Sequence, residues 1–225
     1  MPSAVGICNL SLALLGDRAT VSSIDPPEGS VQASSCATFY PIARDALQEM
    51  HAWGFCTRRA PLALLAATPP SEWAYVYAAP DSLINILAVT SSVASDDYGT
   101  SIPMPYSVVG GPDTATGYGV YTPQPYVVES LDDGTSVIYT NQQDAVLRHT
   151  VLVTDTTKFT ALFTTTLSHL LASYLAGPVL KGEVGRGESV AQLKLAMNFL
   201  SQAKTSDANQ RRATPQHNAP WMGNR

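Results

Sequence analysis

The sequence predicts an α+β protein, in which a helical bundle built from both chain ends carries an inserted antiparallel β domain. Apolar residues recur at three- and four-residue steps near both ends, whereas the middle is rich in β-branched and aromatic residues. Lysine and arginine are absent from residues 60–147, so nine carboxylates give this window a charge of −9 and leave the rest at +4. We expect a discontinuous helical bundle of residues 1–59 and 155–206, an inserted strand-rich domain of residues 60–154, and an extended C-terminal arm of residues 207–225.

Two helices are expected before the strand-rich part. Residues 3–15 place apolar side chains on one stripe, and Gly16 offers the left-handed position that ends many helices. Asp25-Pro26-Pro27-Glu28 supplies an N-cap acid, a proline at N1 and a glutamate at N3, which predicts the start of a second helix that runs to the aromatic residues 53–55. Pro41 lies inside this helix and predicts a kink or a break into two helices.

The middle of the chain predicts strands. The short aromatic and β-branched runs are residues 73–77, 83–89, 126–130, 136–140 and 145–154. Asp133-Gly134 falls between two of these runs and indicates a hairpin turn. Residues 98–125 combine several glycines and prolines with four tyrosines, which is typical of a long irregular loop.

Helical spacing returns at Thr157 and is expected to end or kink at Gly177-Pro178. A last helix is predicted over residues 188–206. Its stripe would contain Val190, Leu193, Met197, Leu200 and Lys204. The tail beyond Asp207 is polar and is not expected to order on its own. The helices of the two chain ends should meet, because neither set buries its apolar stripe alone.

Composition argues against several classes of function. No stretch approaches the ~20 apolar residues of a membrane span. Cys8, Cys36 and Cys56 lack metal-binding or C-x-x-C spacing, which indicates reduced, buried thiols in a protein made in the cytosol. A window at −9 repels phosphate, so it should bind neither nucleic acid nor an anionic membrane. It could instead line a passage through which DNA slides without binding.

Enzymatic chemistry is not expected. The four histidines are His51, His149, His169 and His217, and they form no metal-ligand motif. His169 lies beside an apolar stripe and is interpreted as a core histidine. No segment completes a nucleophile elbow or a phosphate loop. Asp96-Asp97 and Asp132-Asp133 are interpreted as turn acids rather than a general acid and base. We therefore predict no catalytic residue, no cofactor and no metal.

Several blocks of sequence together resemble one family. The N-terminal blocks are Ile7-Cys8-Asn9-Leu10, Leu14-Leu15-Gly16-Asp17, Ile24-Asp25, Phe39-Tyr40-Pro41 followed by Ala43-Arg44-Asp45, and His51-x-Trp53-x-Phe55. The later blocks are residues 60–63, residues 73–77, residues 86–89, and a closing helix pair that ends with Lys204 and Asp207-Ala208. Over about residues 1–90 and 157–208, the pattern resembles bacteriophage head-to-tail adaptors of the tail tubular protein A type, from short-tailed phages.

This resemblance implies a structural virion protein of the phage tail, made in the host cytoplasm and located at the head-tail junction. Members of the family form a homo-oligomeric ring, typically a dodecamer, between the portal protein and the tail nozzle protein. DNA passes through the ring during ejection and is not bound specifically. The implied fold is a helical bundle from both chain ends with a β domain inserted between them, and no membrane is involved.

Four sets of residues are candidates for contacts. The C-terminal arm, with Arg211, Arg212, Trp221 and Arg225, is either a portal-binding segment or a solvated end. Arg44, Asp45, Arg58 and Arg59 are expected to form salt bridges between helices or subunits. Asp96, Asp97, Asp132 and Asp133 are candidates for an acidic channel surface.

Tyr118 and Tyr121 belong to an alternative interpretation of the chain. In it, the protein is a β-rich binding module that recognises a tail-fibre protein or a host glycan through the tyrosine-, glycine- and proline-rich loop of residues 98–126. The two interpretations are compatible, because an adaptor can also carry a docking site for tail fibres.

Overall fold

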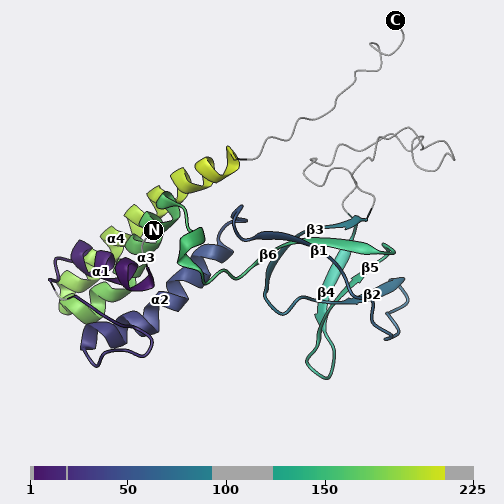
Figure 1. Cartoon of the computed structure of the whole chain (residues 1–225), viewed down its shortest axis with the longest axis horizontal. Helices are drawn as coiled ribbons and strands as arrows, with labels where there is room; N and C mark the ends of the chain where they lie inside the picture. Colours follow the sequence, from purple (N-terminus) through teal and green to yellow (C-terminus); the bar gives the residue numbers. More distant parts are fainter. Residues whose placement is uncertain (1–2, 19, 93–123, 211–225) are drawn as a thin grey trace, which may run out of the picture. The chain divides into compact units, whose positions relative to one another are not determined.

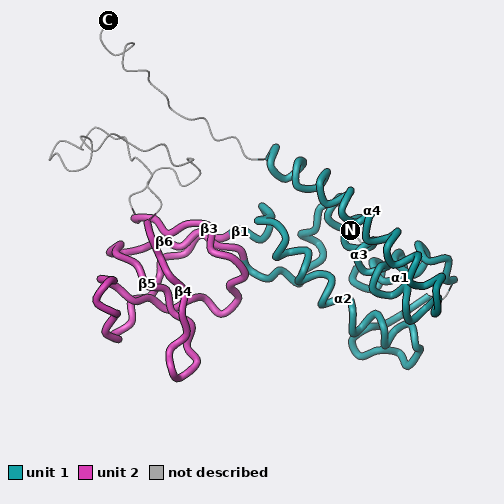
Figure 2. The backbone as a smooth tube through the Cα atoms, turned by 180° about the vertical axis from the view of Figure 1, so that it is seen from behind, with its two compact units in different colours: residues 1–57, 151–210 teal, residues 58–150, 211–225 magenta. Residues whose placement is uncertain are grey.

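The computed structural model describes residues 3–18, 20–92 and 124–210 (Figure 1). Within these residues the chain forms four α-helices, a short 3-10 helix and two three-stranded antiparallel sheets, which confirms the α+β class. The chain divides into two compact units. The first contains residues 1–57 and 151–210, and the described part of the second lies within residues 58–150 (Figure 2).

The first helix of the first unit confirms the prediction. Helix α1 (Ala4–Leu14) begins at the N-cap Ser3 and ends at Gly16, whose φ is +77°. Glycine adopts this left-handed conformation without a steric penalty. The N–H of Asp17 then donates to the carbonyl of Leu12 at 3.1 Å, which completes a Schellman motif.

Helix α2 (Val31–Glu49) begins later than predicted. Its N-cap is Ser30, whose Oγ accepts the N–H of Ala33 at 3.1 Å. Glu28, expected at N3, precedes the helix instead, where its carboxylate accepts hydrogen bonds from Ser22 and Ser30. The N-terminal signal at residues 25–28 was therefore interpreted wrongly, because its glutamate stabilises the loop and not the helix.

Two prolines lie inside continuous helices. Helix α2 runs through Pro41, so of the predicted kink or break the break does not occur. Helix α3 (Ala161–Leu180) likewise runs through Pro178 and ends two residues later. A proline removes one main-chain hydrogen bond from a helix. At Pro41 this loss is offset by packing, since Tyr40 and Ala43 are both buried.

Helix α3 is the central element of the first unit. Twelve of its 20 residues are buried, and α1, α2 and helix α4 (Gly182–Ala208) all pack against it. The 3-10 helix η2 (Thr156–Lys158) precedes it, where the sequence predicted the first turn of the α-helix. The N-cap Thr160 then accepts the N–H of Phe163 at 3.2 Å.

Helix α4 buries a different face from the one predicted. The residues that it buries are Gly185, Gln192, Ala196, Leu200, Ala203 and Asp207. Of the predicted stripe only Leu200 is among them, while Val190, Leu193 and Met197 are exposed. The physical reason is the close approach of α4 to α3, since a Cβ built at Gly185 would lie 2.8 Å from the carbonyl oxygen of Ala176. Only a residue without a side chain fits at position 185, while Ala196 and Ala203 are further small residues of the same face.

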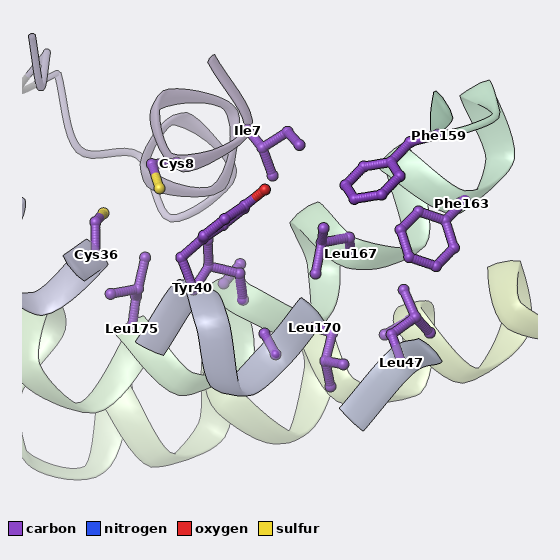
Figure 3. Packing of buried hydrophobic residues seen from close by; sticks show 14 of the residues in the cluster. Ile7, Cys8, Cys36, Tyr40, Leu47, Phe159, Phe163, Leu167, Leu170 and Leu175 are labelled. Atoms are coloured by element: carbon purple, nitrogen blue, oxygen red, sulfur yellow. The ribbon is translucent and has the colours of Figure 1, made fainter. Parts of the chain in front are cut away.

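The core of the first unit draws on all four helices. Figure 3 shows the packing of core residues from α1, α2 and α3. Its largest fully buried side chains are Trp53, Phe159, Phe163, Ile7, Leu12, Leu47, Leu167, Leu170, Leu171 and Leu175. Cys8, Cys36 and Cys56 are buried free thiols, as predicted. None of the described helices combines the length and the apolar character needed to cross a membrane.

The second unit consists of two sheets. One has the order β1 (Thr57–Pro61), β6 (Ala145–Val151), β3 (Leu83–Ser91), and the other has the order β2 (Tyr75–Ala78), β5 (Ser136–Thr140), β4 (Tyr126–Ser130). The hairpin between β4 and β5 is confirmed, with Gly134 at φ +84° in its turn. Strand β6 ends three residues before the predicted boundary. Strand β1 was not predicted, because its sequence contains two arginines and no alternating apolar residues.

Candidate functional site

One buried carboxylate fastens the end of α4 to the segment that follows α2. Asp207 is 5% exposed, and its Oδ1 accepts the main-chain N–H of Gly54 at 2.9 Å. Its Oδ2 lies 3.2 Å from Nε2 of His51. An ionised carboxylate only accepts hydrogen bonds, so Nε2 of His51 is the donor in this pair. We call His51, Gly54 and Asp207 the Asp207 clamp.

Aromatic packing positions the N-terminal half of the clamp. The ring of His51 lies 4.8 Å from that of Trp53 in an edge-to-face arrangement, and Trp53 makes a similar contact with Phe163 at 5.0 Å. The indole N–H of Trp53 donates to the carbonyl of Leu47 at 2.9 Å. Phe55 lies 5.1 Å from Phe163. These contacts fix the turn after α2, so the N–H of Gly54 is held in place to meet the carboxylate.

The clamp also explains the glycine at position 54. A Cβ built there would lie 3.1 Å from Oδ1 of Asp207. That separation is tighter than ordinary van der Waals contact, so a side chain at residue 54 would push the carboxylate away. The prediction that the C-terminal arm begins at residue 207 is therefore wrong, because Asp207 and Ala208 belong to α4.

Two amide side chains make further main-chain contacts in this unit. Gln48 donates from Nε2 to the carbonyl of Val153 at 2.7 Å, and its Oε1 accepts the Val153 N–H at 2.9 Å. Asn9 forms the same two-bond pair with Val21, at 2.9 and 2.7 Å. Asn9 belongs to one of the blocks that resemble the adaptor family. Sequence reasoning missed Gln48. The available signal was its spacing, because Gln48 follows the stripe residues Cys36 and Tyr40 at multiples of four residues and is buried with them.

The predicted salt-bridge residues fall in two places. Arg44 and Asp45 are neighbours on α2, with Nε and Oδ1 2.7 Å apart, so this ion pair lies within one helix and not between two. Arg58 and Arg59 were expected at the end of a helix, but they are exposed residues of β1.

Strand pairing brings together the two borders of the cation-free window. The main-chain hydrogen bonds that set the register of β1 and β6 run from Val151 to Cys56 (3.0 Å) and from Leu62 to Ala145 (2.9 Å). The two bonds are six residues apart on each strand, so Arg59 lies opposite Arg148 and Arg58 lies opposite His149. The described part of the second unit thus gathers its three arginines on one pair of strands. Its six described carboxylates lie elsewhere, at Glu72, Asp81, Glu129, Asp132, Asp133 and Asp144.

Some of the remaining candidate residues lie in the described part of the chain and others lie outside it. Asp132 and Asp133 are exposed in the β4–β5 turn, and Oδ1 of Asp133 accepts the N–H of Thr135 at 2.8 Å, which lowers the pKa of Asp133. They are turn acids, as interpreted. The candidates outside the described residues are Asp96, Asp97, Tyr118, Tyr121, Arg211, Arg212, Trp221 and Arg225.

His169 confirms its interpretation as a core histidine. Its Nδ1 lies 2.7 Å from Oε1 of Gln192, and its ring stacks on that of Phe199 at 5.1 Å. In the described part of the chain, no group of histidine, cysteine, aspartate and glutamate side chains is arranged to hold a metal ion. The described contacts join segments that are distant in the sequence.

A scan of protein-family models found no match to the chain, and a search of curated proteins found no sequence that matches it.

Proposed function

We propose that the chain is a head-to-tail adaptor of a short-tailed bacteriophage, of the tail tubular protein A type. In this proposal many copies, typically twelve, form a ring in the virion between the portal and the tail nozzle. DNA passes through the ring without being bound. The protein acts by fastening other proteins together and not by catalysis.

The observation that carries the proposal is the Asp207 clamp. The resemblance rests on separate blocks of sequence, among them His51-x-Trp53-x-Phe55 and Asp207-Ala208. These blocks are more than 150 residues apart, yet His51 and Asp207 are hydrogen-bonding partners. Ile7, Cys8, Tyr40 and Trp53, from the same blocks, are buried. Several of the residues that suggest the family thus help to hold the first unit together, which supports a shared architecture.

The charge distribution of the second unit is also compatible with an adaptor. Its described residues carry six carboxylates and three arginines, and the arginines lie on β1 and β6. A surface with this excess of carboxylates repels DNA phosphates. In the proposal, the helices of both chain ends form the bundle that builds the ring, and the β unit is an insertion that contributes to the conduit or meets the nozzle.

Affinity purification of the tagged chain from phage-producing cells, followed by native mass determination, tests this function. We expect a multi-copy assembly that contains a portal-like protein. A monomer that captures no particle protein, even when mixed with assembled heads, would contradict the proposal.

The predicted portal-binding arm needs a truncation that leaves the Asp207 clamp intact. A chain that ends at Gln210 keeps all of α4, whereas one that ends at Ser206 removes the clamp carboxylate as well. We expect the Gln210 truncation to unfold at the same temperature as the full chain and to lose attachment to the portal. Unimpaired attachment would show that the arm is a solvated end.

A further inference from the structure

We propose that the outer face of α4 binds the outer face of α2 in a second copy of this chain, in a head-to-tail contact. This inference rests on the proposed function, because it supplies the contact between neighbouring subunits of a ring. It is carried by two helix faces whose apolar residues and charges complement each other.

The outer face of α4 carries an exposed apolar stripe with basic residues around it. Val190, Leu193 and Met197 are 53%, 40% and 42% exposed and recur at three- and four-residue steps, so they form one row. Single exposed apolar residues are normal on a protein surface, whereas an aligned row indicates an interaction site. The basic residues on the same face are Arg186, Lys194 and Lys204, and one acid, Glu183, begins the row.

The outer face of α2 has the opposite charge. Val31 and Ile42 are 74% and 53% exposed, and Asp45 and Glu49 follow Ile42 at three- and four-residue steps. The side chain of Asp45 is half exposed, whereas that of its partner Arg44 is mostly buried. This face therefore presents apolar residues beside carboxylates, while the α4 face presents apolar residues beside ammonium and guanidinium groups. Such complementarity favours pairing of the two faces.

These two faces do not pack against each other within one molecule. Both α2 and α4 turn their buried faces toward the core and pack against α3. The apolar residues of both outer faces are nevertheless exposed, so the two faces do not cover each other within one molecule. A contact between different faces of two copies is heterologous, and its repetition generates a closed ring when the rotation between copies closes. A second copy is therefore the occupant that these two faces fit.

The test mixes two variants of the full chain, each with one face disabled. Variant A carries Leu193→Glu and Met197→Glu on α4, and variant B carries Ile42→Glu on α2. All three positions are exposed, and circular dichroism and thermal unfolding check that each variant folds. Val184→Glu is the matched control, because Val184 is 71% exposed on a different face of α4.

Sedimentation equilibrium and native mass spectrometry give the readout. We expect the wild-type chain and Val184→Glu to self-associate, more weakly at high salt. Variants A and B alone should associate at least about tenfold more weakly, since each loses apolar contact area and gains a buried charge. Their mixture should form a 1:1 heterodimer and nothing larger, through the intact α2 face of A and the intact α4 face of B.

Other results would overturn this contact. A wild-type chain that stays monomeric at every concentration, a variant that assembles like the wild type, or a mixture that stays monomeric would each do so. Portal capture by the tagged chain is scored separately. If capture persists while the heterodimer fails to form, the adaptor function stands and the ring is held through other surfaces.

Discussion

Asp207 and Gly54 are fitted to each other across 153 residues of sequence. The carboxylate oxygen that accepts the Gly54 N–H at 2.9 Å is the same oxygen that a Cβ at residue 54 would crowd at 3.1 Å. The hydrogen bond and the missing side chain are thus two aspects of one contact. Its role is to hold the last turn of α4, from which the C-terminal segment departs.

Removing the clamp carboxylate should destabilise the first unit. In Asp207→Ala the Gly54 N–H loses its acceptor, so we expect the free energy of unfolding to fall by about 1–3 kcal/mol in urea denaturation. Ser206→Ala, at an exposed position one residue earlier, is the control and should change little. Equal effects of the two substitutions would mean that the clamp contributes no stability.

Two glycines of α4 should respond in opposite directions to the same substitution. Gly185→Ala places a methyl group 2.8 Å from the Ala176 carbonyl oxygen, so overpacking should destabilise the protein by about 1–3 kcal/mol. Gly187 has nothing within 4 Å of its added Cβ. Gly187→Ala should therefore stabilise the helix by up to about 1 kcal/mol. Thermal unfolding measures both, and stabilisation by Gly185→Ala would contradict the close packing of α3 and α4.

The buried amide of Gln48 should matter far more than an exposed one. Gln48→Ala leaves the N–H and the carbonyl of Val153 without these two hydrogen bonds, so we expect a loss of at least about 1–3 kcal/mol. Gln202→Ala makes the same change on the exposed side of α4 and should be nearly neutral. Urea denaturation of both variants gives the comparison, and a neutral Gln48→Ala would show that water replaces the lost partners.

Two buried tyrosines should respond differently to loss of the hydroxyl. Among the described residues, the hydroxyl of Tyr40 is buried with no hydrogen-bond partner, and burial raises the pKa of Tyr40 to about 12. Tyr40→Phe removes an unsatisfied polar group and should be neutral or stabilising by about 1 kcal/mol. Tyr77 donates to the carbonyl of Gln142 at 2.9 Å, so Tyr77→Phe should cost about 1 kcal/mol. Destabilisation by Tyr40→Phe would reveal a partner for its hydroxyl.

His149 should make the second unit less stable in mild acid. Burial lowers the pKa of His149, and the charge of Arg58 lowers it further, while the carbonyl of Leu147 opposes both. A lowered pKa means that the unfolded chain takes up a proton first as the pH falls. The contribution of His149 to the free energy of unfolding is therefore fully present above its ordinary pKa of about 6.5, and it is lost as the pH falls below that value. Stability should fall more steeply from about pH 7 to pH 5 in the wild type than in His149→Gln, and equal slopes would contradict this.

Local signals predicted the elements that depend on local chemistry. The Gly16 end of α1 and the Asp-Gly turn of the β4–β5 hairpin are fixed by backbone conformations that few residues adopt. The start of α2 was missed because Asp25 and Ser30 are both acceptable N-caps, and the choice depends on where the Glu28 carboxylate bonds. That bond is a property of the folded loop.

The site could be predicted less well, because its partners are distant in sequence. Asp207 looks like the first residue of a polar tail until its acceptor role for Gly54 is known. The face that α4 buries was also predicted wrongly. The prediction followed the most apolar stripe, whereas close packing against α3 buries small residues such as Gly185 and Ala196. Strand β1 has no apolar pattern and is defined by its pairing with β6.

Because β1 pairs with β6, the chain enters and leaves the second unit at neighbouring points. The chain enters it along one strand and leaves along the neighbouring one, so residues 62 and 145 are joined by a main-chain hydrogen bond. A two-residue turn is enough to connect antiparallel partners at that point. Residues 63–144 can therefore be exchanged for a tight hairpin or for a foreign domain whose ends lie equally close. The first unit would then keep its own chain path, whatever segment replaces residues 63–144 between β1 and β6.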